Sequence, residues 1–215
     1  MRIPMNAGLG SLAVVLLAAL TCAAPSLAQT TPSDETSKAA RILAISVCVH
    51  CHGAAGLSAD TDVPRIAGQQ RTYLEVQIKN FLAQTRRDPE AQHYMWGISS
   101  AWLANAEIIA QIAVYFSSPP PAQNKPGDAR VVALGKQLYE KANADARLPS
   151  CMGCHWANAE GLSVSPRLAG QHADYLTKEM KMQRVGLRGS PPMHGGVLGL
   201  ADDEIVALAT YMESK

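Results

Sequence analysis

The stretches Cys48-Val49-His50-Cys51-His52 and Cys151-Met152-Gly153-Cys154-His155 decide how this sequence folds. In each, two cysteines lie three positions apart and a histidine follows directly. On a helical turn this spacing presents both sulfurs to one side. It is the attachment signature of a c-type haem, in which each cysteine forms a thioether with a haem vinyl group. The sequence therefore predicts two haem c groups, bound by Cys48, Cys51, Cys151 and Cys154, with His52 and His155 as proximal iron ligands.

Zinc binding and redox disulfides are the other common uses of paired cysteines. Zinc would need four ligands converging from two distant pairs. A thioredoxin-like pair belongs to a βαβ unit, which this sequence does not show. Neither alternative explains why a histidine follows both pairs, so the haem interpretation is favoured.

The sequence around the two stretches is also duplicated, which predicts two similar halves. Both copies continue with Gly-Leu-Ser (56–58 and 161–163), Pro-Arg-(Ile/Leu)-Ala-Gly-Gln (64–69 and 166–171) and Tyr-Leu (73–74 and 175–176). Between the halves, a run rich in proline favours an extended connection. The predicted organisation is a signal peptide at 1–28, a first domain at 29–116, a linker at 117–128 and a second domain at 129–215.

The first 28 residues have the features of a secretory signal. Arg2 is the positive start, residues 13–24 are apolar, and Ser26-Leu27-Ala28 is a small-x-small cleavage site. Cys22 lies inside this segment and would be removed with it. The apolar run is short for a membrane span, and an uncleaved amino-terminal anchor is the alternative. The predicted location is the periplasm.

Hydrophobic periodicity predicts an all-α fold, with three main helices in each half. The expected ranges are 37–47, 69–84 and 105–116, then 129–141, 171–184 and 202–212. Asn105 and Asp202 are suitable N-cap residues for the two closing helices. With only 2 Phe, 3 Trp and 6 Tyr, the chain is short of large core residues, and a haem in each half would fill the interior.

The sixth iron ligand is predicted to be Met95 in the first half and Met193 in the second. Met95 is the only methionine between the first haem motif and the linker, and Met193 occupies the corresponding loop. A thioether closes the iron coordination and raises the potential, which suits an electron carrier. His93 and His194 lie beside these methionines and are alternative ligands, since imidazole also binds haem iron.

Several residues after each motif are candidates for supporting the haem. A backbone carbonyl at Pro64 or Pro166 would accept the N–H of the proximal imidazole and fix its orientation. Donors to the haem propionates are expected among Arg65, Arg167, Gln69, Gln171, Tyr73 and Tyr175. The alternative is that the tyrosines only pack and the arginines are solvated. His50 is expected to point away from the haem, and His172 to be a surface or interdomain residue.

With these features the chain resembles the dihaem class I cytochromes c of the c-four type over essentially all of its mature length. The resemblance rests on the duplicated motif, the Pro-Arg-(Ile/Leu)-Ala-Gly-Gln segments, the methionines, and closing helices ending at Tyr115 and Tyr211. It implies two tandem cytochrome c domains, each a small helical fold around a covalently bound haem, with His/Met ligation. Members are periplasmic, sometimes membrane-associated, and pass electrons from a quinol-oxidising complex to terminal oxidases.

The resemblance implies an electron carrier and not an enzyme, with redox proteins as partners and no small-molecule substrate. A dihaem subunit of a periplasmic dehydrogenase, such as a sulfide-oxidising flavocytochrome, is the alternative. A thiosulfate dehydrogenase or peroxidase would need an open or unusual sixth position. Removing Arg2 with the signal leaves 18 basic and 18 acidic residues, so nucleic acid is not an expected partner. The first half departs from the second in its extra residues between Arg86-Arg87 and Met95.

Overall fold

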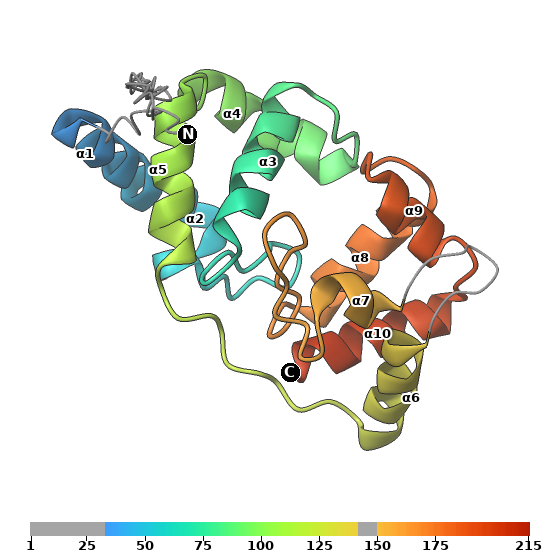
Figure 1. The fold of residues 1–215 in the computed structure, drawn as a ribbon. Coiled ribbons are helices and arrows are strands. Elements are labelled where there is room, and N and C mark those ends of the chain that lie inside the picture. Colours follow the sequence, from blue (N-terminus) through green and yellow to red (C-terminus); the bar gives the residue numbers. More distant parts are fainter. Residues whose placement is uncertain (1–32, 142–149) are drawn as a thin grey trace, which may run out of the picture. The chain divides into compact units, whose positions relative to one another are not determined.

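The computed structural model describes residues 33–141 and 150–215, and its regular structure in these ranges is helical, without a strand. Two groups of helices are joined by an extended segment (Figure 1). The first contains α1 (Asp34–Leu43), η1 (Ala44–Cys48), α2 (Val49–His52), η2 (Ala54–Gly56), α3 (Arg71–Leu82), η3 (Ala91–Met95), α4 (Trp96–Trp102) and α5 (Ala106–Ser117). The second contains α6 (Ala129–Glu140), α7 (Cys151–His155), α8 (Ala173–Arg184), α9 (Pro191–Val197) and α10 (Asp202–Glu213). The predicted signal peptide, with Cys22, lies outside the described residues.

The six predicted main helices are all present, and side-chain caps mark the start of α1, α5 and α6. Asn105 is the N-cap of α5, where its Oδ1 accepts from the amides of Glu107 and Ile108 at 2.8 and 3.1 Å. The prediction of Asp202 as a cap is wrong by one position, because α10 begins at that residue. Ala201 stands at the N-cap instead, and its amide donates to Glu204 Oε2 at 2.9 Å.

The segments that carry the predicted methionine ligands are helical, which corrects the expectation of loops. Met95 ends the π-helical turn η3 and is followed by α4. Met193 lies inside α9, which starts with Pro191 and Pro192. Proline is tolerated in a first helical turn, where its missing N–H has no intrahelical partner. Local propensity disfavours α9 because two glycines follow Met193, so packing against the neighbouring α8 overrides it.

The connection between the two groups runs from Ser118 to Asp128 without a helix or strand. Asp128 caps α6, since its Oδ1 accepts from the amides of Arg130 and Val131 at 2.9 and 3.2 Å. Both groups of helices belong to one compact unit, Pro32–Lys215. The division into domains at 29–116 and 129–215 therefore stays a prediction.

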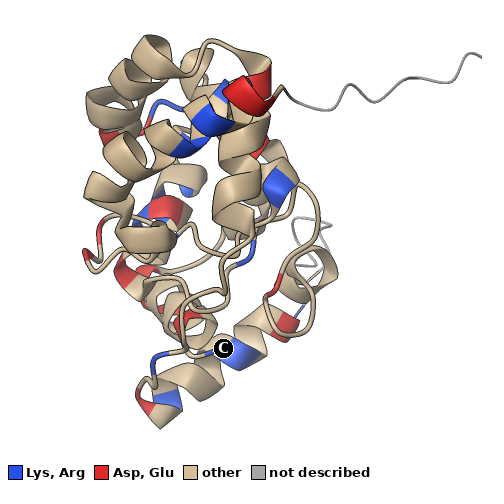
Figure 2. Ribbon diagram, turned by 90° about the vertical axis from the view of Figure 1, so that its left-hand side faces the viewer, with Lys and Arg blue, Asp and Glu red and all other residues tan. Residues whose placement is uncertain are grey.

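Charged residues are spread over both groups of helices (Figure 2). The side chain of Asp202 on α10, for example, pairs with Lys181 and Arg184 of α8 at 2.8 and 2.6 Å. Among the described residues, no single helix has the length and apolar character of a membrane span. The bent pair Ala91–Trp102 and Ala106–Ser117, with 120° between its members, meets those criteria only when both helices are taken together.

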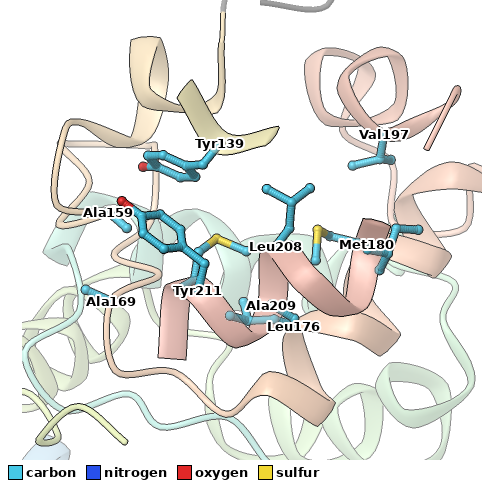
Figure 3. Close-up of a cluster of buried hydrophobic side chains, with 11 residues drawn as sticks. Tyr139, Ala159, Ala169, Leu176, Met180, Val197, Leu208, Ala209 and Tyr211 are labelled. Carbon is cyan, nitrogen blue, oxygen red and sulfur yellow. The ribbon is translucent and has the colours of Figure 1, made fainter. Parts of the chain in front are cut away.

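The core of the second half is built around α10, as Figure 3 shows. Ile205 and Leu208 are 0% and 2% exposed there. Tyr139 of α6 packs against Tyr211, with ring centroids 5.3 Å apart, and its hydroxyl donates to the carbonyl of Trp156 at 2.7 Å. A buried tyrosine hydroxyl normally needs such a partner. The core thus secures the segment that directly follows the second haem motif.

Gly135 on α6 allows close approach to α10, because a Cβ at this position would lie 2.0 Å from the carbonyl oxygen of Ala207. We predict that Gly135→Ala lowers the free energy of unfolding by about 1–3 kcal/mol through overpacking. Denaturant unfolding followed by circular dichroism measures this loss. Ala133→Ser adds one atom to an exposed position of the same helix and should change stability by less than about 0.5 kcal/mol. Equal effects of the two substitutions would contradict the packing argument.

The two halves are joined by a reciprocal set of hydrogen bonds from the repeated Pro-Arg-(Ile/Leu)-Ala-Gly-Gln segments. The Gln69 amide receives the N–H of Arg167 at 2.7 Å and donates to its carbonyl at 2.9 Å. Gln171 does the same with the backbone of Arg65, at 2.9 and 2.8 Å. Each glutamine thus pairs with the main chain of the other half as a neighbouring strand would. We call these four contacts the glutamine clasp.

The glycine before each clasp glutamine has a positive φ, 63° for Gly68 and 72° for Gly170. Such backbone angles favour glycine. The limited space also requires glycine at both positions. An added Cβ at Gly68 would lie 2.8 Å from Pro121 N, and one at Gly170 would lie 2.8 Å from Ala122 O. The connecting segment therefore packs directly against both glycines.

Candidate functional site

A cavity of about 1820 Å³ lies between the helices and is lined by residues of both halves. Cofactor and ligand pockets commonly measure roughly 300–1,000 Å³, so this space suits more than one large group. Its wall includes every predicted haem-binding residue of the two halves: Cys48, Cys51, His52, Met95, Cys151, Cys154, His155 and Met193. The structure thus brings each cysteine pair, its histidine and its methionine to one cavity.

The two motif histidines have matched environments. His52 Nδ1 donates to the carbonyl of Pro64 at 2.9 Å, and His155 Nδ1 donates to that of Pro166 at 3.0 Å. This confirms the predicted role of the proline carbonyls. Burial lowers the pKa of both histidines, and the hydrogen bonds to the proline carbonyls oppose that shift only in part. Each ring is therefore neutral at neutral pH and keeps Nε2 available as an iron ligand.

The motif cysteines lie on short helical segments: Cys48 ends η1, Cys51 lies within α2, and Cys151 and Cys154 lie within α7. Cys48 and Cys151 are half-buried, whereas Cys51 and Cys154 are exposed. Burial raises the pKa of the Cys48 thiol to about 11, and burial also raises that of Cys151. A redox-active or metal-binding cysteine typically has a lowered pKa. The described residues also contain no group of three or more His, Cys, Asp or Glu side chains suited to a metal ion. The raised pKa values of these two thiols disfavour a reactive redox pair.

The histidines beside the predicted methionine ligands differ between the halves. In the second half, Met193 lines the cavity, while His194 is outside its wall and donates through Nδ1 to the carbonyl of Gln183 at 2.8 Å. In the first half, both Met95 and His93 line the cavity. The geometry therefore favours Met193 over His194, whereas His93 remains an alternative to Met95.

Two of the predicted propionate donors, Gln69 and Gln171, have partners that the sequence did not indicate, since both form the glutamine clasp. Arg65 is not simply solvated, because its Nη1 donates to the carbonyl of Gly170 at 2.7 Å. Arg167 also lines the cavity, and its Nε is buried without a hydrogen-bond partner. A buried unpaired donor is costly, so Arg167 suits a carboxylate placed in the cavity.

Of the other two histidines, His172 lies as predicted, whereas His50 is a wall residue of the cavity, against the expectation that it points away from the haem. His50 is exposed. His172 is 3% exposed, and its Nε2 donates to the carbonyl of Ser58 in the other half at 2.9 Å. His172 is thus an interdomain residue and not an iron ligand.

Sequence reasoning missed a buried group of charges on the cavity wall: Arg86, Asp88, Glu179 and Arg188. A signal for the arginines is present, because Arg86 and Arg188 are 102 positions apart, as Pro64 and Pro166 are. The repeat therefore stays in register beyond the Tyr-Leu pairs. Nothing in the local sequence indicates that these side chains would meet.

The residues of this cavity fit two covalently attached haems. Each half supplies two thiols, a neutral imidazole fixed by a carbonyl, and a thioether, while Arg167 offers a donor to a carboxylate. When bound, haem iron supplies a one-electron couple between ferric and ferrous states. The chain's own part is to orient the proximal ring through Pro64 or Pro166 and to exclude water with apolar residues such as Leu74, Ile112 and Leu208.

Comparisons with known proteins agree with this chemistry. The cytochrome c family model matches residues 132–215. Cytochrome c4 from Thiocapsa roseopersicina is 33% identical over 85% of this chain and 94% of its own length. The chain belongs to the cytochrome c4 family. The solved cytochrome c4 of Acidithiobacillus ferrooxidans superposes with a TM-score of 0.72 at 29% identity, over 78% of this chain and 98% of that one. A thiosulfate dehydrogenase electron acceptor of Thiomonas intermedia is 29% identical over 95% of this chain and 90% of its length.

Membership in the cytochrome c4 family establishes the fold as two tandem helical cytochrome c folds and the cofactors as two covalently bound haem c groups. The protein is an electron carrier and not an enzyme, and its partners are redox proteins. The assignment of the individual iron ligands rests on the motifs and on the cavity geometry described above.

Proposed function

We propose that this cytochrome c4 carries electrons in the periplasm from a quinol-oxidising complex to a terminal oxidase. The observation that carries the proposal is the pair of matched ligand sets on one cavity wall. In each half a methionine lines the same cavity as the motif histidine, which supports a sixth iron ligand supplied by the chain and disfavours a substrate at the iron. Location in the periplasm is supported by the predicted signal peptide at 1–28, and mature protein beginning at Gln29 is expected from an intact mass.

A second function is favoured by the relative from Thiomonas intermedia, which is named as an electron acceptor of thiosulfate dehydrogenase. In this alternative, the protein accepts electrons from a periplasmic dehydrogenase instead of a quinol-oxidising complex. This is the same class of role as the dehydrogenase subunit considered from the sequence, with thiosulfate in place of sulfide as the oxidised compound. The geometry of the haem sites is the same in both cases, so the donor must be identified by kinetics.

The two functions are separated by mixing oxidised dihaem protein with each donor and following haem reduction by stopped-flow absorbance. The first donor is a membrane preparation of the source organism with quinol, and the second is a thiosulfate dehydrogenase with thiosulfate. We expect rapid reduction by the membranes, sensitive to an inhibitor of quinol oxidation, and reoxidation by terminal oxidase. Reduction only by thiosulfate and its dehydrogenase would replace the first proposal with the second.

A further inference from the structure

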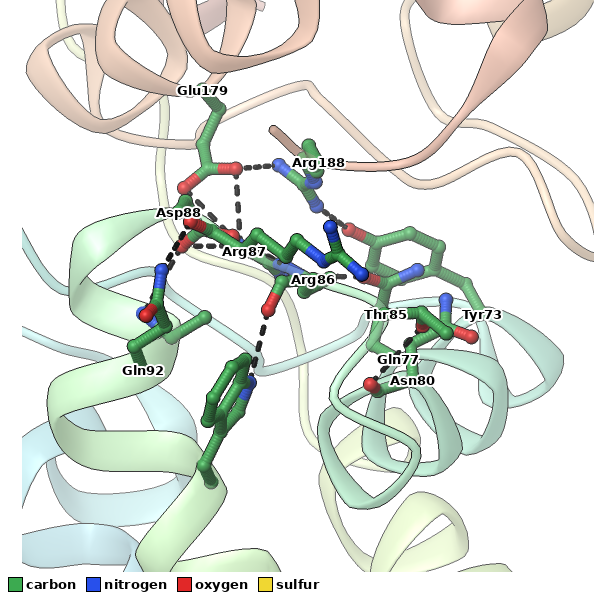
Figure 4. Close-up of polar contacts among 12 residues, drawn as sticks. Tyr73, Gln77, Asn80, Thr85, Arg86, Arg87, Asp88, Gln92, Glu179 and Arg188 are labelled. Carbon is green, nitrogen blue, oxygen red and sulfur yellow. Dashed lines mark hydrogen bonds and ion pairs between the residues drawn. The ribbon is translucent and has the colours of Figure 1, made fainter. Parts of the chain in front are cut away.

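Four charged side chains form a buried cluster between the two halves: Arg86, Asp88, Glu179 and Arg188 (Figure 4). We call this the charge cluster. Its side chains are 6%, 1%, 6% and 10% exposed, respectively. Two positive and two negative groups give it no net charge. Buried charges interact more strongly and over longer distances than exposed ones, because solvent screens them less.

Glu179 is the member shared by both halves. Its carboxylate accepts from Arg86 Nη2 of the first half at 3.2 Å and from Arg188 Nη1 of its own half. Arg188 in turn donates to the hydroxyl of Tyr73 in the first half. Burial alone lowers the pKa of Arg188, but the Glu179 carboxylate and neighbouring groups raise it well above its ordinary value. Both arginines are thus charged and reach across the interface.

The internal repeat shows that Glu179 is an asymmetric feature. Positions 77 and 179 are 102 residues apart, as are Arg86 and Arg188. The first half has the neutral Gln77, whose Oε1 accepts from Arg86 Nη1 at 3.2 Å. The carboxylate that neutralises Arg86 within its own half is Asp88, bound at 3.0 and 3.2 Å. Asp88 belongs to the longer segment before Met95 and has no acidic counterpart in the second half.

All four members of the charge cluster and Gln77 line the cavity that also contains both sets of predicted ligands. A negative charge near a haem stabilises its ferric state and lowers its potential, whereas a positive charge does the opposite. The Glu179 carboxylate is bound by arginines from both halves, so its charge is placed to act on both irons.

We propose that Glu179 is a tuning residue common to both haems, so that its charge sets the two midpoint potentials together. Loss of this carboxylate leaves Arg188 without an acidic partner and gives the charge cluster a net positive charge. Both haems are then harder to oxidise. The proposal rests on the presence of two haems and not on the identity of the donor, so a redox titration tests it independently of the partner kinetics.

The test is a spectroelectrochemical titration of purified dihaem Glu179→Gln, in which the two reduction waves are resolved. We expect both midpoint potentials to rise. Asp174→Asn is the matched control, because it removes the same formal charge from an exposed position of the same helix, α8. The control should leave both potentials within error of the unaltered protein. Glu179→Asp, which keeps the charge, should restore most of the original values.

The reverse substitution, Gln77→Glu, adds a carboxylate at the equivalent position of the first half. We expect both potentials to fall, a change of sign that a merely structural disturbance would not produce. This variant removes no existing ion pair, so it decides the proposal even where Glu179→Gln does not fold. Movement of one wave alone, shifts of the same sign in the two variants, or a shift of equal size in Asp174→Asn would overturn the proposal.

Discussion

Cytochrome carrying Cys48→Ala and Cys51→Ala together is expected to contain one covalent haem per chain instead of two. Without either thiol, no thioether can hold the haem of the first half. His52 and its bond to Pro64 remain, but a histidine alone does not attach a haem covalently. The second half keeps its own complete set of ligands, so its haem is retained.

The measurement is the haem content per chain after denaturation, together with the mass of the intact protein. The mirror variant, Cys151→Ala with Cys154→Ala, is the control and should also retain one haem, now in the first half. We further expect a large loss of stability in the altered half, because the haem fills much of its apolar interior. Two covalent haems in either double variant would refute the assignment of the cysteines.

Replacement of Met193 by alanine is expected to remove the sulfur ligand from the second haem and to lower its potential. Axial ligands set haem potentials over about 0.8 V in total, and loss of a thioether should account for on the order of 0.1 V or more of that range. The weak near-red absorption band of ferric haem bound to sulfur should fall to half its strength, since one of two such ligands is lost.

His194→Ala is the matched control for this experiment, because its ring is hydrogen-bonded to the Gln183 carbonyl and lies outside the cavity wall. It should leave the near-red band unchanged. A near-red band that is unchanged in Met193→Ala, together with a shifted potential of the second haem in His194→Ala, would reverse the assignment. In the first half, the corresponding variants are Met95→Ala and His93→Ala. Because both residues line the cavity, His93→Ala there tests an alternative iron ligand and is not a neutral control.

Much of this fold could be predicted because its determinants are local. The cysteine spacing and following histidine lie within five residues, and helix periodicity is likewise a short-range pattern. The proline carbonyls could be anticipated because they stand at nearly the same distance from both histidines. The helical setting of Met193 could not, because two prolines and two glycines in one short segment favour a turn, and tertiary packing overrides that preference.

The contacts between the halves could not be predicted from the sequence, for a different reason. Glu179 and Arg86 are 93 residues apart, and each looks like an ordinary solvated charge on a helix or a loop. The glutamine clasp is similar, because Gln69 and Gln171 were candidates for haem contacts when judged from position alone. Their backbone partners lie 98 and 106 residues away. Such pairings follow from how the halves pack, which a linear pattern does not encode.

The glutamine clasp has an evolutionary consequence. Its four hydrogen bonds are made by two copies of one segment, each serving the other, which is the arrangement of a self-complementary homodimer. In a homodimer, a single mutation alters both copies at once and breaks the whole set. Fusion into one chain lifts that constraint, because a mutation then affects only one copy. The two copies differ at equivalent positions beside the clasp, where the first half has Gln70 and Gln77 and the second has His172 and Glu179. A tandem chain thereby permits two unequal redox centres within one repeated scaffold.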